Sequence, residues 1–375
     1  MTTAALALLT QQVLWASFLV AMGFGAVVQR TGFCTMGAIS DVAVMGDWTR
    51  MRQWGLAVGI AMIGFGLLAW SGAIDPDRTL YASKRWLWLS ALTGGGIFGL
   101  GMVLSSGCPS KALVRVGGGN LKALVVLIVL GLSAFATLKG LTAVWRTATV
   151  DQIAVEFATS ARLPSWAAQA FGVQPALAGL VLALMIGGGL VAWALAARES
   201  LHPVNLMAGG GVAAAVLAAW WISGHWGYVP EHPETLEATF LATNSGRAEA
   251  LSFVSPIAYS LDWLMFFSDR NKVLSVGIMS VFGVVAGSAA MALATRRFRW
   301  EGFAGTEDLA HHLVGAVLMG VGGVTAMGCS IGQGISGVST LSATSLVAVS
   351  AMIAGARAGL GYQSWRLEHT ALAHT

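Results

Sequence analysis

Residues 86–117 read WLWLSALTGGGIFGLGMVLSSGCPSKALVRVG, and this stretch decides the fold class. Its first part, Trp86–Ser106, carries no charged residue and is long enough to cross a hydrocarbon core of roughly 30 Å as a helix. The apolar run then stops at Gly107-Cys108-Pro109, where proline suits the first position of a new helix. The stretch therefore predicts a membrane-spanning helix followed by a second helix that is too short to cross.

The composition of the whole chain indicates the same class of protein. Of 375 residues, 56% are hydrophobic and 10% are charged, against roughly 25% charged in an average soluble domain. A soluble exterior is therefore excluded. The 48 glycines and 15 tryptophans are typical of close helix packing in a lipid bilayer and of its headgroup level. The net charge of +4 is small, so we expect no nucleic-acid partner.

The apolar periodicity predicts an all-α integral membrane protein with about nine spans and four short helices. The short segments are too short to cross, and we expect re-entrant half-helices, which are tolerated where protein or water surrounds them. The predicted spans are 12–28, 55–71, 86–106, 121–138, 175–197, 205–223, 274–294, 310–327 and 343–360. The predicted half-helices lie in Thr31–Asp41, Gly107–Gly119, Leu251–Asp262 and Gly328–Ser339.

An internal repeat relates the two halves of the chain. A shift of 221 residues places several residues on a like residue: Asp41 on Asp262, Gly94 on Gly315, Gly101 on Gly322 and Gly107-Cys108 on Gly328-Cys329, with Cys34 on Ser255. Such a register across separate segments indicates duplicated units. We expect 1–374 to be a single membrane domain with these parts: repeats at about 12–140 and 205–360, a connector helix at 175–197, and extramembrane loops at 141–170 and 224–250.

Charged loops predict the orientation. Arg296, Arg297 and Arg299 mark a cytoplasmic loop, whereas loop 224–250 is rich in glutamate. This assignment places the N-terminus outside and the C-terminus in the cytoplasm, and it makes the second repeat inverted. Lys84 falls outside in this scheme and does not fit it. Inverted repeats with broken helices that meet near the midplane are a transporter design.

The cysteines begin the predicted half-helices. Helix N-termini leave backbone N–H groups without partners and attract anions. Cys34, Cys108, Ser255 and Cys329 are therefore candidates for the lining of a pathway.

The residues that follow two of these cysteines are further candidates. Lys111 and Arg115 follow Cys108 at helical spacing, on one face, and could guide an anion toward the cytoplasm. Gln333 and Ser336 follow Cys329 at the same kind of spacing and offer neutral donors.

Several of these residues also have a purely structural interpretation. A buried cysteine is commonly a small apolar filler, and Lys111 could be an interfacial anchor. Asp41 and Asp262 could cap the backbone or pair with Arg30 and Arg270. His311-His312 is better explained by a helix start than by a metal pair. We expect no metal and no cofactor.

Three segments carry a resemblance to a known family. These are Arg30-Thr-Gly-Phe-Cys34-Thr-Met-Gly-Ala-Ile-Ser-Asp41, Ser106-Gly-Cys108-Pro-Ser-Lys111 and Met327-Gly-Cys329-Ser-Ile-Gly-Gln333. They resemble the signature segments of the YeeE/YedE sulfur-transport family, and the resemblance covers roughly 12–360. The chain departs from the family in its longer 141–170 and 224–250 loops.

The resemblance implies a function and a partner. It implies an hourglass-shaped, multi-pass transporter of the bacterial inner membrane that imports thiosulfate and is not an enzyme. Cys34, Cys108 and Cys329 would hydrogen-bond the anion along a central pathway, with Cys108 the most important. It also implies a small cytoplasmic sulfur-carrier protein of the TusA type as partner.

Other functions remain open at this stage. The substrate could be another sulfur or selenium species. A membrane thiol oxidoreductase or sulfurtransferase could use persulfide chemistry, although the chain has no CxxC pair. A passive scaffold explains the repeat least well. A transported anion needs donors along its path, and the sequence suggests a path without a lining acid.

Overall fold

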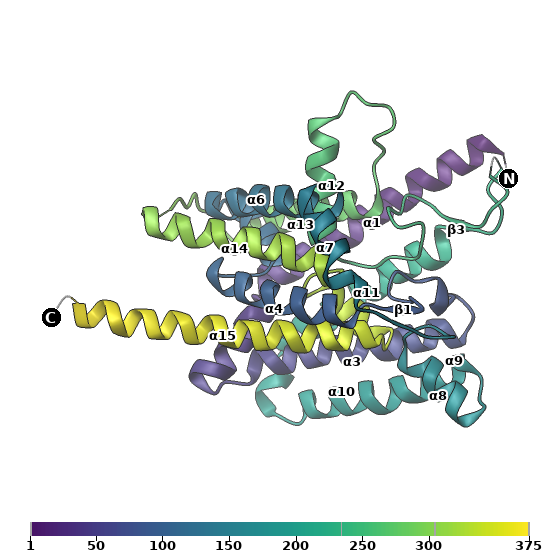
Figure 1. The fold of residues 1–375 in the computed structure, drawn as a ribbon, viewed down its shortest axis with the longest axis horizontal. Helices are drawn as coiled ribbons and strands as arrows, with labels where there is room; N and C mark the ends of the chain where they lie inside the picture. Colours follow the sequence, from purple (N-terminus) through teal and green to yellow (C-terminus); the bar gives the residue numbers. More distant parts are fainter. Residues whose placement is uncertain (1, 234, 304, 374–375) are drawn as a thin grey trace.

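The computed structural model describes residues 2–373 except 234 and 304, and it is mostly helical (Figure 1). Within the described residues, eight helical segments are long and apolar enough to cross a membrane. They are built on α1 (Thr3–Thr31), α3 (Thr49–Trp70), α4 (Trp88–Leu104), α6 (Leu121–Lys139), α9 with α10 (Pro175–Leu182 and Gly188–Leu195), α11 (Pro203–Trp221), α13 (Val276–Ala294) and α15 (Ala343–Ala373).

The ninth span expected at 310–327 does form a helix, α14 (Thr306–Thr325). It packs between α4 and α6. However, α14 is not among the eight segments that meet the length and hydropathy requirement. Its first turn carries Glu307 and Asp308, and these acids lower its hydropathy.

Short helices occupy the four segments where half-helices were predicted. They are α2 (Thr35–Ser40), α5 (Pro109–Gly117), α12 (Val254–Met265) and the π-helical turn η7 (Gly332–Gly337). Further π-helical turns continue or interrupt longer helices: η1 (Asp41–Met45), η4 (Ala183–Gly187) and η6 (Ile222–Trp226). Short 3₁₀ turns are η2 (Pro76–Arg78), η3 (Val150–Gln152) and η5 (Arg198–Leu201).

The loops between spans contain more structure than expected. Strand β1 (Arg85–Trp86) pairs antiparallel with β2 (Val155–Glu156), and β3 (Tyr228–Val229) pairs antiparallel with β4 (Thr239–Phe240). Loop 141–170 also contains α7 (Leu141–Ala148) and the start of α8 (Leu163–Phe171). The fold is therefore mostly helical, as expected, and polar backbone outside the spans pairs in these two short ladders.

Helices α4 and α14 are in backbone contact at glycines. A Cβ atom added to Gly94 would lie 2.8 Å from the Gly322 carbonyl oxygen, and one added to Gly101 would lie 2.7 Å from the Gly315 carbonyl oxygen. Helices α1 and α13 make a comparable contact, because a Cβ atom on Gly25 would lie 2.3 Å from the Val284 oxygen. Small residues thus permit the close approach that drives helix association in lipid.

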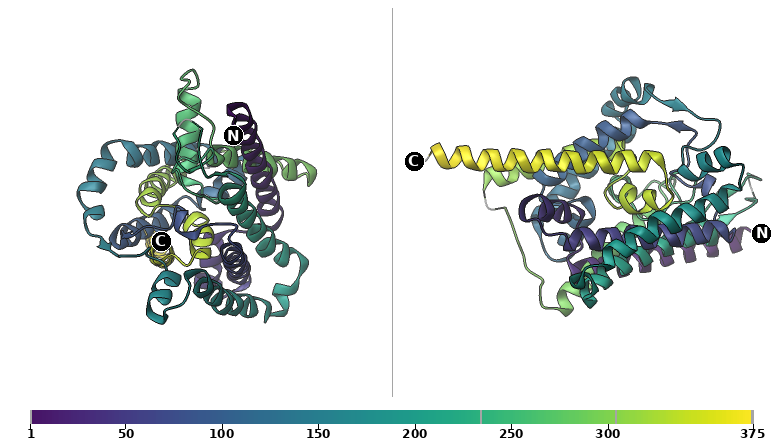
Figure 2. Two further views of the ribbon diagram at one scale, coloured as in Figure 1. Left: turned by 90° about the vertical axis from the view of Figure 1, so that its right-hand side faces the viewer. Right: turned by 90° about the horizontal axis from the view of Figure 1, so that it is seen from below.

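The two termini lie at opposite ends of the long axis of the molecule (Figure 1). Helix α15 (yellow) runs along this axis toward the C-terminus, and α1 (purple) starts at the other end; the second view of Figure 2 shows the same arrangement. We refer to these as the C-terminal end and the N-terminal end of the bundle.

Candidate functional site

Each cysteine stands at the start of a short helical segment. The Cys34 thiol caps α2 and accepts a hydrogen bond of 3.3 Å from the Gly37 amide. Cys108 is the residue before α5, with Pro109 as its first helical residue. The Cys329 thiol accepts from the Gly332 amide at 3.3 Å. All three thiols therefore lie where free backbone N–H groups gather.

The same turn precedes Cys108 and Cys329. Ser106 has a φ of 55° and Met327 a φ of 58°, both in the left-handed region that non-glycine residues rarely adopt. The amides of the glycines that follow bond back to the preceding helix: Gly107 to Met102 at 2.9 Å, and Gly328 to Gly323 at 2.8 Å. This sharp turn ends the preceding helix and places a buried cysteine before the next helical segment.

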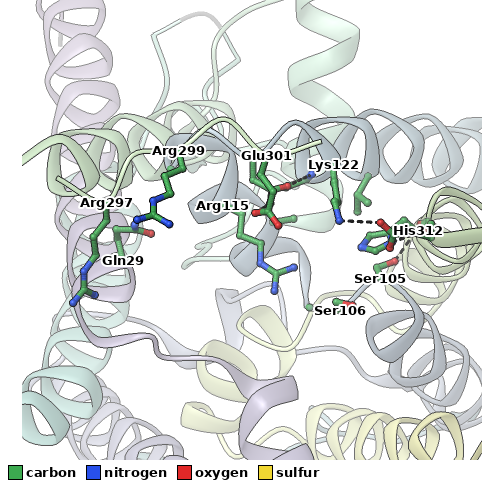
Figure 3. Close-up of a pocket in the computed structure, with 16 residues that line it drawn as sticks. Gln29, Ser105, Ser106, Arg115, Lys122, Arg297, Arg299, Glu301 and His312 are labelled. Atoms are coloured by element: carbon green, nitrogen blue, oxygen red, sulfur yellow. Dashed lines mark hydrogen bonds and ion pairs between the residues drawn. The ribbon is translucent and has the colours of Figure 1, made fainter. Parts of the chain in front are cut away.

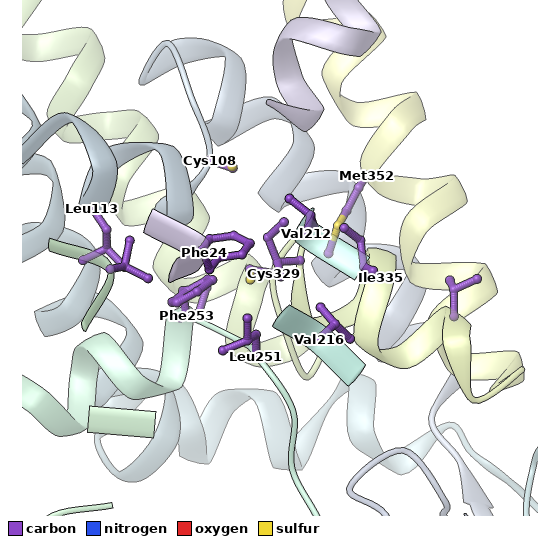
Figure 4. Close-up of a cluster of buried hydrophobic side chains, with 14 of the residues drawn as sticks. Phe24, Cys108, Leu113, Val212, Val216, Leu251, Phe253, Cys329, Ile335 and Met352 are labelled. Atoms are coloured by element: carbon purple, nitrogen blue, oxygen red, sulfur yellow. The ribbon is translucent and has the colours of Figure 1, made fainter. Parts of the chain in front are cut away.

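The three cysteine segments converge in the interior of the bundle. The Cys34 and Cys108 thiols are close enough to interact, and the Cys108 thiol also lies near the Ser330 hydroxyl. Cys108 is 1% exposed and Cys329 0%. Both thiols lie within the main buried cluster of apolar side chains, as Figure 4 shows. All three cysteines are free thiols.

A small cavity beside this cluster has a mainly apolar lining, and three buried polar atoms without partners belong to residues around it. It is lined in part by Thr35, Trp54 and Ser330. The Thr35 hydroxyl, the Trp54 indole N–H and the Ser330 hydroxyl are buried and make no hydrogen bond within the described chain. Buried polar groups are rarely left unpaired, so these three donors fit a polar ligand or water next to the thiols.

Lys111 and Arg115 extend the site along α5. The Lys111 ammonium lies close enough to Cys34 and Cys108 for electrostatic interaction, and also close to Arg115 and Arg50. Arg115, one helical turn further on, reaches the next cavity toward the C-terminal end. The predicted spacing therefore places one cation beside the thiols and one beyond them.

That cavity, which we call the arginine pocket, has a volume of about 450 Å³ (Figure 3). Its lining includes four basic side chains, Arg115, Lys122, Arg297 and Arg299, and two acids, Glu301 and Asp308. The acids are engaged: Lys122 contacts Asp308 at 2.8 Å, and Asn120 donates to Glu301 at 2.5 Å. The pocket extends inward to Ser106 and Gly107, directly before Cys108.

A second cavity, the Glu249 pocket, has a volume of about 240 Å³. Its lining includes Ser255, Glu249, Tyr259 and Arg146, and it extends inward to Met327, two residues before Cys329. Ser255 therefore lies in this pocket rather than in the cysteine cluster. The sequence suggested a path without a lining acid, whereas Glu249 lines this cavity and two acids line the arginine pocket. Glu249 was missed because its loop carries other glutamates, and nothing in the sequence distinguishes the enclosed one.

The two pockets lie toward opposite ends of the bundle. Helix α6 lines the arginine pocket with Lys122 and the Glu249 pocket with Leu138, about 24 Å apart along a helix axis. Helix α14 likewise lines the arginine pocket with His312 and the Glu249 pocket with Val324. The cysteine motifs lie between them, because the inner limit of each pocket is the turn before a cysteine.

Gln333 and Ser336 are buried and already engaged by the protein. The Gln333 side-chain amide donates to the Ala326 carbonyl at 2.7 Å and accepts from Ser345 at 2.5 Å. The Ser336 hydroxyl donates to the Leu251 carbonyl at 2.8 Å. These bonds hold the segment after Cys329 in place.

The two acids of the repeat form ion pairs, but with other partners than expected. Asp41 pairs with Arg50 at 3.3 Å, and Asp262 pairs with Lys272 at 2.6 Å. The expected partners Arg30 and Arg270 are not used in these pairs. His312 contacts Asp308 at 3.1 Å, and among the described residues no group of three or more His, Cys, Asp or Glu side chains could hold a metal ion.

Comparison with known proteins shows the family of the chain. The model of a family described as sulphur transport matches residues 30–358. The chain belongs to this sulphur transport family. The match includes all three cysteine segments, so the resemblance to YeeE/YedE proteins is confirmed.

Two relatives of the sulphur transport family align over most of the chain. The thiosulfate transporter TsuA of Spirochaeta thermophila is 27% identical over 346 residues, which is 89% of this chain and 94% of the relative. The thiosulfate transporter TsuA of Escherichia coli is 26% identical over 323 residues, 83% of each chain. The chain is thus a multi-pass membrane protein of a transporter family, which implies a non-enzymatic role.

Proposed function

We propose that this protein imports thiosulfate, or a closely related small sulfur oxyanion, through the cysteine cluster between its two pockets. One observation carries the proposal: the Cys34 and Cys108 thiols and Ser330 meet in the buried interior, at the starts of short helices. The two relatives are thiosulfate transporters, and this favours thiosulfate as the substrate.

The chemistry of the cluster suits a sulfur oxyanion. Thiols are compact, polarizable weak donors, and backbone amides at helix starts stabilise negative charge. The unpartnered Thr35, Trp54 and Ser330 groups would bond the oxygens of the anion. The ammonium of Lys111 lies beside the thiols and would offset part of the charge of a dianion.

The pathway would run from the Glu249 pocket, past the cysteines, to the arginine pocket. Ser255 lies in the first pocket and Arg115 in the second. Gln333 and Ser336 would act by holding the Cys329 segment. With the N-terminus outside and the C-terminus in the cytoplasm, the basic pocket faces inward and favours import.

Two inverted repeats would form this path as an hourglass. A symmetric pair of contacts supports the repeats. When each residue of one contact is replaced by the residue 221 positions away, the result is the other contact. The Gly94–Gly322 contact becomes Gly315–Gly101, and both are present. Ser106 and Met327, which are also 221 positions apart, both have a left-handed backbone conformation.

The resemblance to the family supports a proposed location and partner. We place the protein in the bacterial inner membrane, with a cytoplasmic sulfur carrier of the TusA type receiving the imported sulfur. The arginine pocket would face that carrier.

Uptake of radiolabelled thiosulfate tests the proposal in cells that lack other sulfur uptake systems. We expect uptake by the wild type and loss of uptake in Cys108→Ala, with normal membrane insertion checked by immunoblotting of the membrane fraction. Ser350→Ala, an exposed serine of α15, serves as control and should transport normally. No uptake by the wild type, with the carrier present, would exclude thiosulfate; full uptake by Cys108→Ala would remove the central role of that thiol.

A second candidate function is thiol or persulfide chemistry. The contact between Cys34 and Cys108 favours it, because disulfide exchange needs a second thiol beside the nucleophile. The missing CxxC motif therefore does not exclude this activity. Mass spectrometry of protein quenched during thiosulfate uptake distinguishes the two: a persulfide or a Cys34–Cys108 disulfide supports the redox function, and unmodified cysteines support transport alone.

A further inference from the structure

Glu249 is an acid placed in the pocket through which, under the proposed function, an anion would pass. It lies in the segment between β4 and α12. Its backbone amide donates to the Ser223 hydroxyl at 2.9 Å, and its carboxylate accepts from the Ser245 amide at 2.9 Å. These bonds fix both the backbone and the side chain, so the carboxyl group stays in the pocket.

The cations nearest to Glu249 are engaged elsewhere. Among the ion pairs of the described residues, none involves Glu249. Arg247, two residues earlier, donates to the Ala82 carbonyl at 2.6 Å. Arg146, which lines the pocket from α7, pairs with Asp151 at 3.5 Å. The carboxyl group therefore faces the pocket without the ion pair that usually accompanies an enclosed acid.

The other groups around the pocket cannot replace such a pair. Tyr259 of α12 and Tyr81 of the loop before β1 face Glu249. Lys139, at the end of α6, lies over the Tyr259 ring. Asp262 is one turn further along α12 and is held by Lys272. The lining residues from α1, α11, α13 and α14 are serine, glycine and apolar residues.

Burial raises the pKa of the Glu249 carboxyl above its ordinary value, while hydrogen bonds from Ser245 and Asn244 partly oppose this. The group therefore changes charge nearer to neutral pH than an exposed glutamate does.

We propose that Glu249 is a proton-binding site that controls the access of anions to the cysteine cluster. The neutral carboxyl admits a dianion and can donate a hydrogen bond to it. The carboxylate shares the pocket with the dianion and repels it, since charges inside a partly enclosed cavity are screened weakly. This inference rests on the proposed anion transport and adds a dependence on protons to it.

The experiment measures initial rates of radiolabelled thiosulfate uptake into proteoliposomes that contain the full chain. The pH is varied from about 8 to about 6 with the same value on both sides, and potassium with valinomycin holds the membrane potential. We expect the wild-type rate to rise roughly tenfold as the pH falls, because one protonation removes one unit of charge repulsion. Glu249→Gln should keep the high rate at every pH.

Glu237→Gln is the matched control, because Glu237 is an exposed acid of the same loop. It should show the pH dependence of the wild type. Glu249→Asp keeps an acid and should keep a pH-dependent rate. A wild-type pH dependence in Glu249→Gln would overturn the proton-binding site, as would a low rate in a folded Glu249→Gln protein.

Two further outcomes separate this inference from the function on which it rests. Wild-type protein that takes up no thiosulfate at any pH overturns the proposed function and the inference with it. Infrared spectroscopy gives a readout without transport: as the pH falls, the neutral carboxylic acid band should be stronger in the wild type than in Glu249→Gln. Equal bands in the two proteins would overturn the protonation of Glu249.

Discussion

Arg162 donates a hydrogen bond from its Nε atom to the carbonyl oxygen of Thr340 at 3.2 Å, across 178 positions of sequence. The same guanidinium contacts Asp77 at 3.3 Å and its side chain is 5% exposed. Backbone bonds on both sides strengthen the contact, because Leu163 donates to Leu341 at 3.0 Å and Ala343 donates to Ala161 at 3.1 Å. Loop 141–170 therefore holds the segment between Cys329 and α15 in place.

Replacing Arg162 by Ala should destabilise this segment. The Thr340 carbonyl would lose its side-chain donor in a buried position, which costs about 1–3 kcal/mol. We expect a lower melting temperature of the detergent-solubilised protein and lower thiosulfate uptake. Lysine at this position should restore little, because it cannot donate to two partners in the fixed geometry of a guanidinium.

Arg198→Ala is the control for this change, because Arg198 is exposed in η5. It should leave both the melting temperature and uptake unchanged. An Arg162→Ala protein with the melting temperature of the wild type would show that the loop does not stabilise the cysteine segment.

Replacing Gly94 by Ala should separate α4 from α14. The new Cβ atom would lie 2.5 Å from the Ala326 nitrogen and 2.8 Å from the Gly322 oxygen, both of them backbone atoms that cannot rotate away. Overpacking of this kind costs about 1–3 kcal/mol. Gly96→Ala is the matched control two residues along the same helix, because its Cβ atom meets nothing within 4 Å. Thermal unfolding of both variants checks the prediction, and equal melting temperatures would contradict it.

The sequence predicted the short helices and their cysteines because glycine, cysteine and proline interrupt long apolar runs. Gly107-Cys108-Pro109 stops one helix and starts another, and α5 begins there. The sequence did not predict which cysteines meet. Cys34 and Cys108 come from different segments, and only the packing of α2 and α5 brings their thiols together.

The sequence also did not predict which basic residues pair with the acids. Asp41 and Asp262 were expected to pair with basic residues, which they do, but Arg50 and Lys272 are the partners because the chain turns back after each short helix. Glu249 could not be distinguished from exposed glutamates of its loop, since its position depends on the Ser223 and Ser245 contacts.

Replacing Ser330 by Ala should weaken transport without loss of stability. The Ser330 hydroxyl is buried and its neighbouring group is the Cys108 thiol, a weak hydrogen-bond partner, so its removal sacrifices little internal hydrogen bonding. If it bonds the transported anion, we expect KM for thiosulfate to rise roughly tenfold or more, because a hydrogen bond to a charged group contributes about 1.5–3 kcal/mol.

Ser345→Ala provides the contrast to Ser330→Ala. Ser345 is equally buried but donates to Gln333 at 2.5 Å, so its loss should lower the melting temperature. Uptake kinetics and thermal unfolding of the two variants check the pair of predictions. An unchanged KM in Ser330→Ala would show that this hydroxyl does not contact the substrate.

Replacing Glu249 by Gln should raise stability at pH 8 but not below about pH 4, where the unfolded chain also holds the proton. Burial raises the pKa of Glu249 in the folded protein above its value in the unfolded chain, so the folded state holds this proton more tightly. Below the unfolded pKa both states are protonated; as the pH rises through the folded pKa, the wild type loses stability by about 1.4 kcal/mol for each unit between the two pKa values. Glutamine does not ionise and avoids this loss. Thermal unfolding in detergent at both pH values measures the difference, with Glu237→Gln as the exposed control that should show none. A gain of equal size at both pH values would mean that Glu249 remains ionised in the folded protein and that the change acts through packing alone.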